Sequence, residues 1–273
     1  GSVLDSRTQV VAKVPYATHM GAFVHNGSDY TVNHQQRLKA GVYTRAKQNG
    51  EYENHVNVLP GKGFSHRYVL DPARGTFHLE VGQARVPLMP LLKALGATDD
   101  QLKEAWGRDL YAANYGLDSE AALRKLASKA AKPHELEGKT PSEVVAAKFL
   151  AMAQDPEVNR RTLGKPYDRL SADAVLGATR KLLSVFRGEA EPDDRDHLAY
   201  QRVVGPEDLF AERVLLDHGR LRRSLLARAS LRGGLSGLPA GALTPQLEQA
   251  ILGSGLGQTT AEVNPGGPFD NQT

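Results

Sequence analysis

Short apolar runs separated by turn signals fill much of residues 1–85, which is a pattern typical of strands. Three pairs of apolar stretches flank turn signals: 22–25 and 30–32 around Asn26-Gly27, 42–44 and 52–58 around Asn49-Gly50, and 64–70 and 76–81 around the stretch 71–75, which contains Pro and Gly. Asn-Gly favours a two-residue hairpin turn because both residues tolerate a positive φ. The pattern therefore predicts three antiparallel strand pairs.

From Pro87 onward the apolar residues recur at helical spacing. The spacing predicts helices over 88–95, after Thr98, and over 119–129, 142–153, 171–185, 206–231 and 244–252. Thr98 and Ser171 are the expected N-caps, and Leu102 and Trp106 are expected to face inward. Strands followed by helices indicate the α+β class, with an antiparallel, strand-rich N-terminal part and a mainly helical part after it.

The longest predicted helix spans residues 206–231. Its inward-facing candidates are Leu209, Val214, Leu216, Leu221 and Leu225. Residues 189–196 are expected to form an acidic linker. The stretch 253–273 is rich in Gly and is expected to be a poorly ordered loop, because it has few large apolar groups to offset its ordering entropy.

Composition narrows the classes of function. The 273 residues are 40% hydrophobic and 24% charged, as in an ordinary globular protein, and the length allows one or two domains. No cysteine is present, which excludes disulfides, iron–sulfur clusters and a cysteine nucleophile. The formal net charge of +3 permits a nucleic-acid partner without requiring one. No apolar run approaches the roughly 20 residues of a membrane span.

Two groups of residues suggest metal ligands, and for each the plainer interpretation is favoured. Among the nine histidines, His25, His34, His66 and His78 fall on predicted strands, but none has the spacing of a metal site. Hydrogen-bonded or solvated strand histidines are the favoured interpretation. Asp193, Asp194 and Asp196 could supply oxygen ligands to Mg²⁺, yet such a run beside a proline is more often a solvated linker.

Basic residues are clustered more strongly than the net charge suggests. Residues 157–187 hold seven Lys or Arg against three Asp or Glu, and residues 202–232 hold seven against four. Most of these cations are arginines, whose planar guanidinium suits contacts with phosphate. The clusters indicate either a nucleic-acid surface or solvated helix faces.

Three separated segments, in the same order, resemble the β subunit of multisubunit DNA-directed RNA polymerases. The first comprises Val14-Pro15-Tyr16, residues 21–27, Gln35, Gly41-Val42-Tyr43, residues 68–72 and residues 88–96. The second, residues 159–164, is similar to the family's basic Asn-Lys/Arg-Arg-Leu-Gly stretch. The third is residues 193–198 with Gln201-Arg202-Val203, and it is the most specific of the three. After the long helix, residues 252–258 and Asn264-Pro265 resemble the segment leading to the fork loop.

The resemblance covers about residues 14–265 and implies a lobe/protrusion-like fold. It implies protrusion-like strands over 1–41, a lobe-like domain over 42–194, and a return into the protrusion with the long helix over 195–273. The chain would be a fragment or split subunit forming part of the DNA cleft wall near the RNA–DNA hybrid. The implied nucleic-acid contacts are Gln35, Arg37, Arg160, Arg161, Arg220, Gln258 and Asn264.

The resemblance also implies which partners the chain has and which subunit binds the catalytic metal. The partners would be the remaining part of β, a β′-like chain, DNA and the RNA–DNA hybrid, with no membrane. This chain would hold no cofactor and would not be catalytic alone, because the family's catalytic Mg²⁺ is bound by three aspartates of the β′-like subunit. The short lobe, and Ala261 at a place where the family has an acidic residue, resemble a phage-encoded polymerase. The expected compartment is then the cytoplasm or the virion.

Two other classes of function remain open at this point. The first is a stand-alone nucleic-acid-binding or polymerase-regulating module with a lobe-like fold. The second is an enzyme whose site is not visible in the sequence, which is disfavoured because no acid/base or nucleophile constellation is present. A neighbouring reading frame that continues the β sequence would favour the split subunit over the stand-alone module.

Overall fold

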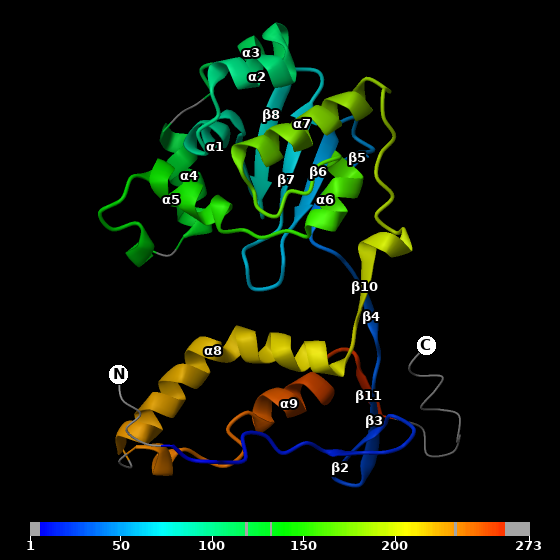
Figure 1. Ribbon diagram of the computed structural model, residues 1–273, viewed down its shortest axis with the longest axis vertical. Coiled ribbons are helices and arrows are strands. Elements are labelled where there is room, and N and C mark those ends of the chain that lie inside the picture. Colours follow the sequence, from blue (N-terminus) through cyan, green and yellow to red (C-terminus); the bar gives the residue numbers. More distant parts are fainter. Residues whose placement is uncertain (1–5, 118–119, 132, 232–233, 260–273) are drawn as a thin grey trace. The chain divides into compact units, whose positions relative to one another are not determined.

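The computed structural model describes residues 6–117, 120–131, 133–231 and 234–259. The chain divides into two compact units (Figure 1). One unit is the continuous stretch Leu38–Gln201, and the other combines Gly1–Arg37 with Arg202–Thr273. Among the described residues, no helix combines the length and the apolar character needed to cross a membrane.

The unit 38–201 is built on a five-stranded antiparallel sheet. Its strands are β5 (Gly41–Ala46), β6 (Tyr52–Asn57), β7 (His66–Asp71), β8 (Thr76–Val81) and β9 (Ala84–Pro87), and each pairs with the next in chain order. The turns at 49–50 and 71–75 therefore join real hairpins, as the sequence predicts. The strand β9, which pairs with β8, was not predicted.

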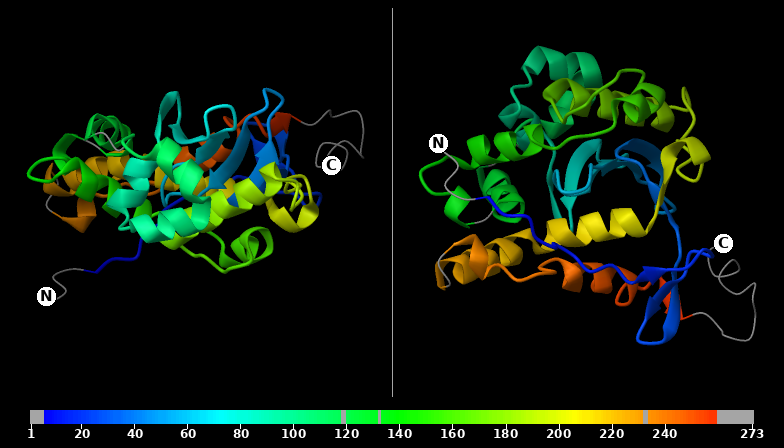
Figure 2. Two further views of the ribbon diagram at one scale, coloured as in Figure 1. Left: turned by 90° about the horizontal axis from the view of Figure 1, so that it is seen from above. Right: turned by 60° about the horizontal axis from the view of Figure 1, so that its bottom comes forward.

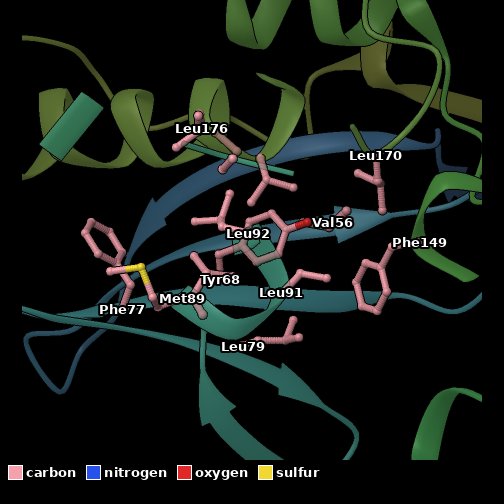
Figure 3. Packing of buried hydrophobic residues seen from close by; sticks show 14 of the residues in the cluster. Val56, Tyr68, Phe77, Leu79, Met89, Leu91, Leu92, Phe149, Leu170 and Leu176 are labelled. Carbon is pink, nitrogen blue, oxygen red and sulfur yellow. The ribbon is translucent and has the colours of Figure 1, made fainter. Parts of the chain in front are cut away.

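Helices cover this sheet and close its core. They are α1 (Met89–Ala94), α2 (Asp99–Trp106), α3 (Arg108–Asn114), α4 (Glu120–Ala130), α5 (Pro141–Leu150), α6 (Pro156–Leu163) and α7 (Ala172–Phe186). Strand residues such as Tyr68 and Leu79 meet Leu91, Phe149 and Leu176 from the helices, and all five are nearly or fully buried (Figure 3). Burying such side chains is the main favourable contribution to folding.

The predicted caps form, and they fix the helix ends. The side chain of Thr98 accepts a hydrogen bond from the backbone N–H of Gln101, whose own side chain accepts from the Thr98 N–H. Ser171 caps α7 in the predicted place. Trp106 faces inward as expected: its ring stacks on Phe77, and its Nε1 donates to Thr179 Oγ1 at 2.9 Å.

Some helical boundaries differ from the prediction. The helix α5 begins at Pro141 after a Thr140 cap and ends at Leu150, so it is shorter than the predicted 142–153. The helices α3 and α6, which are seven and eight residues long, were not predicted. The predicted start of α4 at Ser119 lies outside the described residues.

The second unit combines a four-stranded sheet with two helices. The strands β1 (Tyr16–Ala17), β2 (Phe23–His25), β3 (Ser28–Val32) and β11 (Gly257–Thr259) pair in that order. Asn26 and Gly27 both have positive φ, 50° and 78°, so they form the predicted hairpin turn. The helices are α8 (Pro206–Leu231) and α9 (Thr244–Ile251), and a two-stranded sheet pairs β4 (Gln35–Leu38) with β10 (Gln201–Val204).

Three predictions for this unit need correction. The stretch 253–273 is not a loop throughout, since Gly257–Thr259 pair with Val32–Tyr30 of β3; residues 260–273 lie outside the described part. His34 lies between β3 and β4 and not on a strand. The range of the long helix is confirmed, but of its predicted inward residues only Leu209 is buried, and Leu216 is 77% exposed.

The exposure of α8 follows from what packs on it. Its leucines are distributed around the whole helix, so no short partner can cover all of them. Within this unit, α9 and the 3₁₀ turn at Leu235–Gly237 are its principal helical neighbours, and they cover only part of its surface. The small core of this unit is Val32, Val204, Leu209, Ala250 and Ile251.

The core assignment in the unit 38–201 predicts a stability difference between two identical substitutions. Leu91→Ala removes a fully buried side chain and should lower the free energy of unfolding by about 2–5 kcal/mol. Leu198→Ala, at a side chain that is 74% exposed, should change it by less than about 0.5 kcal/mol. Denaturant unfolding followed by the fluorescence of Trp106, the single tryptophan, measures both; equal effects would contradict the assigned core.

Candidate nucleic-acid interface

The basic stretch at 159–164 is a short, well-capped helix. Asp155 accepts a hydrogen bond from the Glu157 N–H at 2.9 Å, and Pro156 occupies the first helical position. Gly164 ends α6 in the left-handed region, with φ 78°. Both ends of α6 are therefore fixed by local chemistry, and the two arginines inside it stand on regular helical backbone.

Asn159 fastens this helix to the sheet through three side-chain hydrogen bonds, which we call the Asn159 clamp. Its carboxamide is fully buried, and its Oδ1 accepts from the backbone N–H of Val42 at 3.1 Å. Its Nδ2 donates to Gln154 Oε1 at 3.0 Å and to the carbonyl oxygen of Tyr167 at 2.7 Å. One side chain thus joins α6, β5 and the loop before α7.

Gly41 allows the close approach of α6 and β5. A Cβ at position 41 would lie 2.3 Å from Val158 Cγ1, far inside van der Waals contact. The Gly-Val pair at 41–42, which belongs to the family-like segment, is therefore explained by packing: glycine makes room for α6, and the next N–H meets Asn159.

Arg160 and Arg161 are exposed on α6 and differ in their partners. Arg160 forms an ion pair with Glu157 at 3.2 Å, one helical turn away, with both side chains more than half exposed. Within the described part of the chain, Arg161 pairs with no carboxylate. Lys165 and Arg169 nearby form exposed pairs with Asp173 and Asp168 at 3.4 and 3.9 Å. Exposed pairs of this kind contribute little stability and exchange readily for another anion.

The acidic run at 193–196 lies against the outer edge of β5. The Thr44 N–H donates to Asp193 Oδ2 and the Asp193 N–H donates to the Thr44 carbonyl, both at 2.7 Å. Burial raises the pKa of the Asp193 carboxyl, opposed by its bonds to Thr44 and by Lys181 at 3.6 Å. Asp193 is thus an anchor within the linker. Among the residues that the structure describes, no three His, Asp or Glu side chains gather as a metal site would require.

Arg195 continues this anchoring on β6. Its Nη1 lies 2.9 Å from His55 Nδ1, and its carbonyl accepts from the side chain of Gln201. Burial, followed by the neighbouring Arg195 and Arg67, lowers the pKa of His55 to about 4. Burial likewise lowers the pKa of His66 to about 4, and its ring contacts the Tyr68 hydroxyl and the Phe64 carbonyl. His66 is hydrogen-bonded, as the favoured interpretation of the strand histidines supposed, and so is His55, which was not among the histidines named from the sequence.

The ring of Tyr200, at the end of the 3₁₀ turn Leu198–Tyr200, packs on a residue of β5. It packs edge-on against the buried Tyr43, with ring centroids 5.5 Å apart. Burial, and after it the charge of Asp193, raises the pKa of the Tyr200 hydroxyl, and the positive charge of Arg161 opposes this rise.

The remaining predicted contact residues lie in the other unit. Arg37 donates to both carboxylate oxygens of Glu212 at 2.7 and 2.6 Å and also to Gln35, and Arg202 reaches Glu212 at 3.4 Å. The structure thus brings Gln35 and Arg37 together around Glu212. The pairing of Glu212 with Arg37 was not predicted, because the two residues are 175 positions apart in the sequence.

Arg220 and Gln258 lie apart from that group. Arg220 is exposed on α8 and pairs with Asp217 at 2.9 Å, and Gln258 is exposed on β11 opposite Thr31. Asn264 and Ala261 lie outside the described residues. Of the seven predicted contact residues, Arg160, Arg161, Arg220 and Gln258 have the exposure that a contact requires, whereas Arg37 is already paired within the chain.

Comparison with known proteins decides the family. The sequence profile described as RNA polymerase Rpb2, domain 2 matches residues 39–204, more than half of the chain. The chain belongs to this family. The Asn159 clamp, the Arg160-Arg161 pair and the Asp193 anchor all fall inside the matched part of this Rpb2 domain 2 chain.

Curated relatives extend the similarity beyond that domain. The chain is 24% identical over 281 residues to the DNA-directed RNA polymerase subunit beta of Synechococcus elongatus and 26% identical over 289 residues to that of Synechococcus sp. strain WH7803. The corresponding subunit of Gloeobacter violaceus is 24% identical over 288 residues. Each match covers 93% of this chain, and the chain spans about a quarter of the length of these relatives.

The Asn159 clamp predicts a stability cost larger than that of a surface change. Asn159→Ala would leave the buried Val42 N–H and Tyr167 carbonyl without their partner, so the free energy of unfolding should fall by about 2–4 kcal/mol. Arg160→Ala, one residue further on the exposed face, is the matched control and should cost less than about 0.5 kcal/mol. Urea unfolding followed by Trp106 fluorescence compares them; a similar small loss for both would show that the clamp is not needed.

The lowered pKa values of His55 and His66 predict acid sensitivity of the unit 38–201. Because their pKa values are lowered to about 4, the unfolded chain binds more protons than the folded chain between about pH 6.5 and 4. Their contribution to stability is thus complete above that window and is lost as the pH falls through it. The loss approaches about 1.4 kcal/mol per pH unit for each histidine. His55→Gln should remove one histidine's share of the slope in urea unfolding at pH 7 and pH 5, and an unchanged slope would contradict this assignment.

Proposed function

We propose that this chain is part of a DNA-directed RNA polymerase and contacts the DNA backbone through α6. Membership of the Rpb2 domain 2 family and similarity to β subunits over nearly the whole chain support a polymerase subunit part. The observation that carries the DNA contact is the exposed pair Arg160 and Arg161, held on a helix that Asn159 fastens to the sheet. The finer proposal is that the chain forms part of the wall of the DNA cleft.

The chemistry of the proposed contact is electrostatic. A guanidinium binds two phosphate oxygens at once. Within the described residues Arg161 forms no ion pair with a carboxylate, so no ion pair would have to break before it binds phosphate. Arg160 would exchange its exposed pair with Glu157 for a phosphate at little cost. Such contacts fix the position of a duplex without selecting a base sequence, so the proposed role is to hold DNA in place.

The rest of the proposed assembly follows from the same similarity. We propose that the remaining part of β and a β′-like chain complete the polymerase, and that the catalytic Mg²⁺ is bound by the latter. Gln35, Arg37, Arg220, Gln258 and Asn264 are proposed contacts nearer the RNA–DNA hybrid. For Arg37 the proposal requires the pair with Glu212 to open, which makes it the weakest of these contacts.

The proposal predicts how DNA binding depends on salt. The chain should bind a short duplex weakly, and log K should fall with log salt by about 0.9 for each phosphate neutralised. Replacing both Arg160 and Arg161 with alanine should reduce that slope by about 2 and weaken binding at low salt. Fluorescence anisotropy with a labelled duplex at several salt concentrations measures both quantities.

A matched variant separates a specific surface from general charge attraction. Lys125 and Lys129 are exposed on α4 in the same unit, and replacing both with alanine removes the same charge. This control should leave the slope unchanged. If it lowers the slope as much as the arginine variant does, or if neither has an effect, α6 is only a solvated helix face.

A further inference from the structure

Two adjoining hollows lie in the unit formed by 1–37 and 202–273. One, of about 290 Å³, lies among the N-terminal stretch, α8 and the segment before α9, and its apolar wall is Val10, Val11, Leu225, Leu235, Leu238 and Leu243. The other, of about 410 Å³, is bordered by Arg220, Arg228 and Gln246. Leu225, Pro239 and Ala242 line both, so the two hollows share a wall.

Backbone hydrogen bonds hold the floor of the apolar hollow in place. The N–H groups of Gly241 and Leu243 donate to the carbonyls of Val10 and Val11 at 2.7 and 2.8 Å. The side chain of Gln9 donates to the Leu238 carbonyl at 2.6 Å. The N-terminal stretch therefore lies fixed along the segment before α9, as Figure 2 shows, and the hollow is a preformed feature of this unit.

The charge around the hollows is positive. Arg7, Arg220 and Arg228 line them, and neither Arg7 nor Arg228 pairs with a carboxylate in the described part of the chain. Asp217 is the opposing charge; it pairs with Arg213 at 3.4 Å and with Arg220 at 2.9 Å. Gln246 is 4% exposed and donates to Asp217, but its Oε1 has no donor among the described residues.

We propose that these hollows bind an acidic segment of a partner protein with an apolar anchor between its carboxylates. A hollow of about 290 Å³ with aliphatic walls has room for one leucine or phenylalanine side chain. Carboxylates on either side of that anchor would meet Arg220 and Arg228, which border the adjoining hollow. A buried anchor surrounded by charge pairs is the usual centre of a protein interface.

The spacing of the arginines sets the spacing of the acidic residues. Arg220 and Arg228 are eight residues apart on α8, about 12 Å along its axis. An extended peptide covers about 13 Å in four residues and places every second side chain on the same face. The matching pattern is therefore acid, any residue, apolar, any residue, acid.

The test uses the full chain and a labelled peptide containing Glu-Ser-Leu-Ser-Glu. Fluorescence anisotropy should show saturable binding at low salt. A peptide with lysines in place of the glutamates, or serine in place of the leucine, should bind at least about tenfold more weakly. Arg228→Glu should weaken the glutamate peptide about tenfold or more and improve the lysine peptide. Arg223→Glu is the matched control, because Arg223 is exposed on the same helix but lines neither hollow, and it should change neither affinity by more than about twofold.

Each other outcome overturns the proposal. Absence of saturable binding up to about 1 mM removes the peptide as the occupant. Equal losses in Arg228→Glu and Arg223→Glu show general attraction by a basic helix. If Arg228→Glu leaves the peptide unaffected but weakens a short DNA duplex, the arginines serve nucleic acid instead. Arg228 is exposed, so both charge reversals should fold, and matching thermal unfolding curves confirm this.

Discussion

The unit 38–201 depends on how the polar backbone groups along the outer edge of β5 are satisfied. As the first strand of the sheet, β5 has no strand neighbour on one side, and an open edge invites pairing with another chain. Here the N–H groups of Val42 and Thr44 on that edge are taken by the side chains of Asn159 and Asp193. The polar groups of β5 are thereby satisfied by two segments more than 100 residues away.

The hydrogen bonds of Asn159 and Asp193 to β5 also fix the position of the charged groups that matter for the proposed function. Asn159 immediately precedes Arg160 and Arg161, and Asp193 precedes Arg195. In the first motif the polar residue is buried for structure, and the two arginines that follow it are exposed. In the second motif Asp193 and Arg195 both act as anchors, and Asp193 does so through its backbone and its carboxylate.

Signals between neighbouring residues predicted much of this architecture. Pairings between residues that are distant in the sequence could not be predicted from them. Asn26-Gly27 and Thr98 act through neighbouring residues, so their hairpin turn and helix cap were visible in the sequence. The burial of Leu216 depends on what covers α8, and the strand Gly257–Thr259 forms only because β3 is available. The exposure of Arg160 and Arg161 fitted the basic cluster, whereas the roles of Asn159 and Glu212 depend on partners 117 and 175 residues distant.

The ends of the unit 38–201 are neighbours. The Lys39 N–H donates to the Tyr200 carbonyl at 2.7 Å, and the Lys39 ammonium reaches the Ala199 carbonyl, so the chain begins and ends this unit at nearly the same point. A unit whose two ends are adjacent is a cassette: it can grow, shrink or be replaced during evolution while the flanking strands keep their spacing. A change in the length of this unit is then a change in the size of one insert, made without redesign of the polypeptide into which it is inserted.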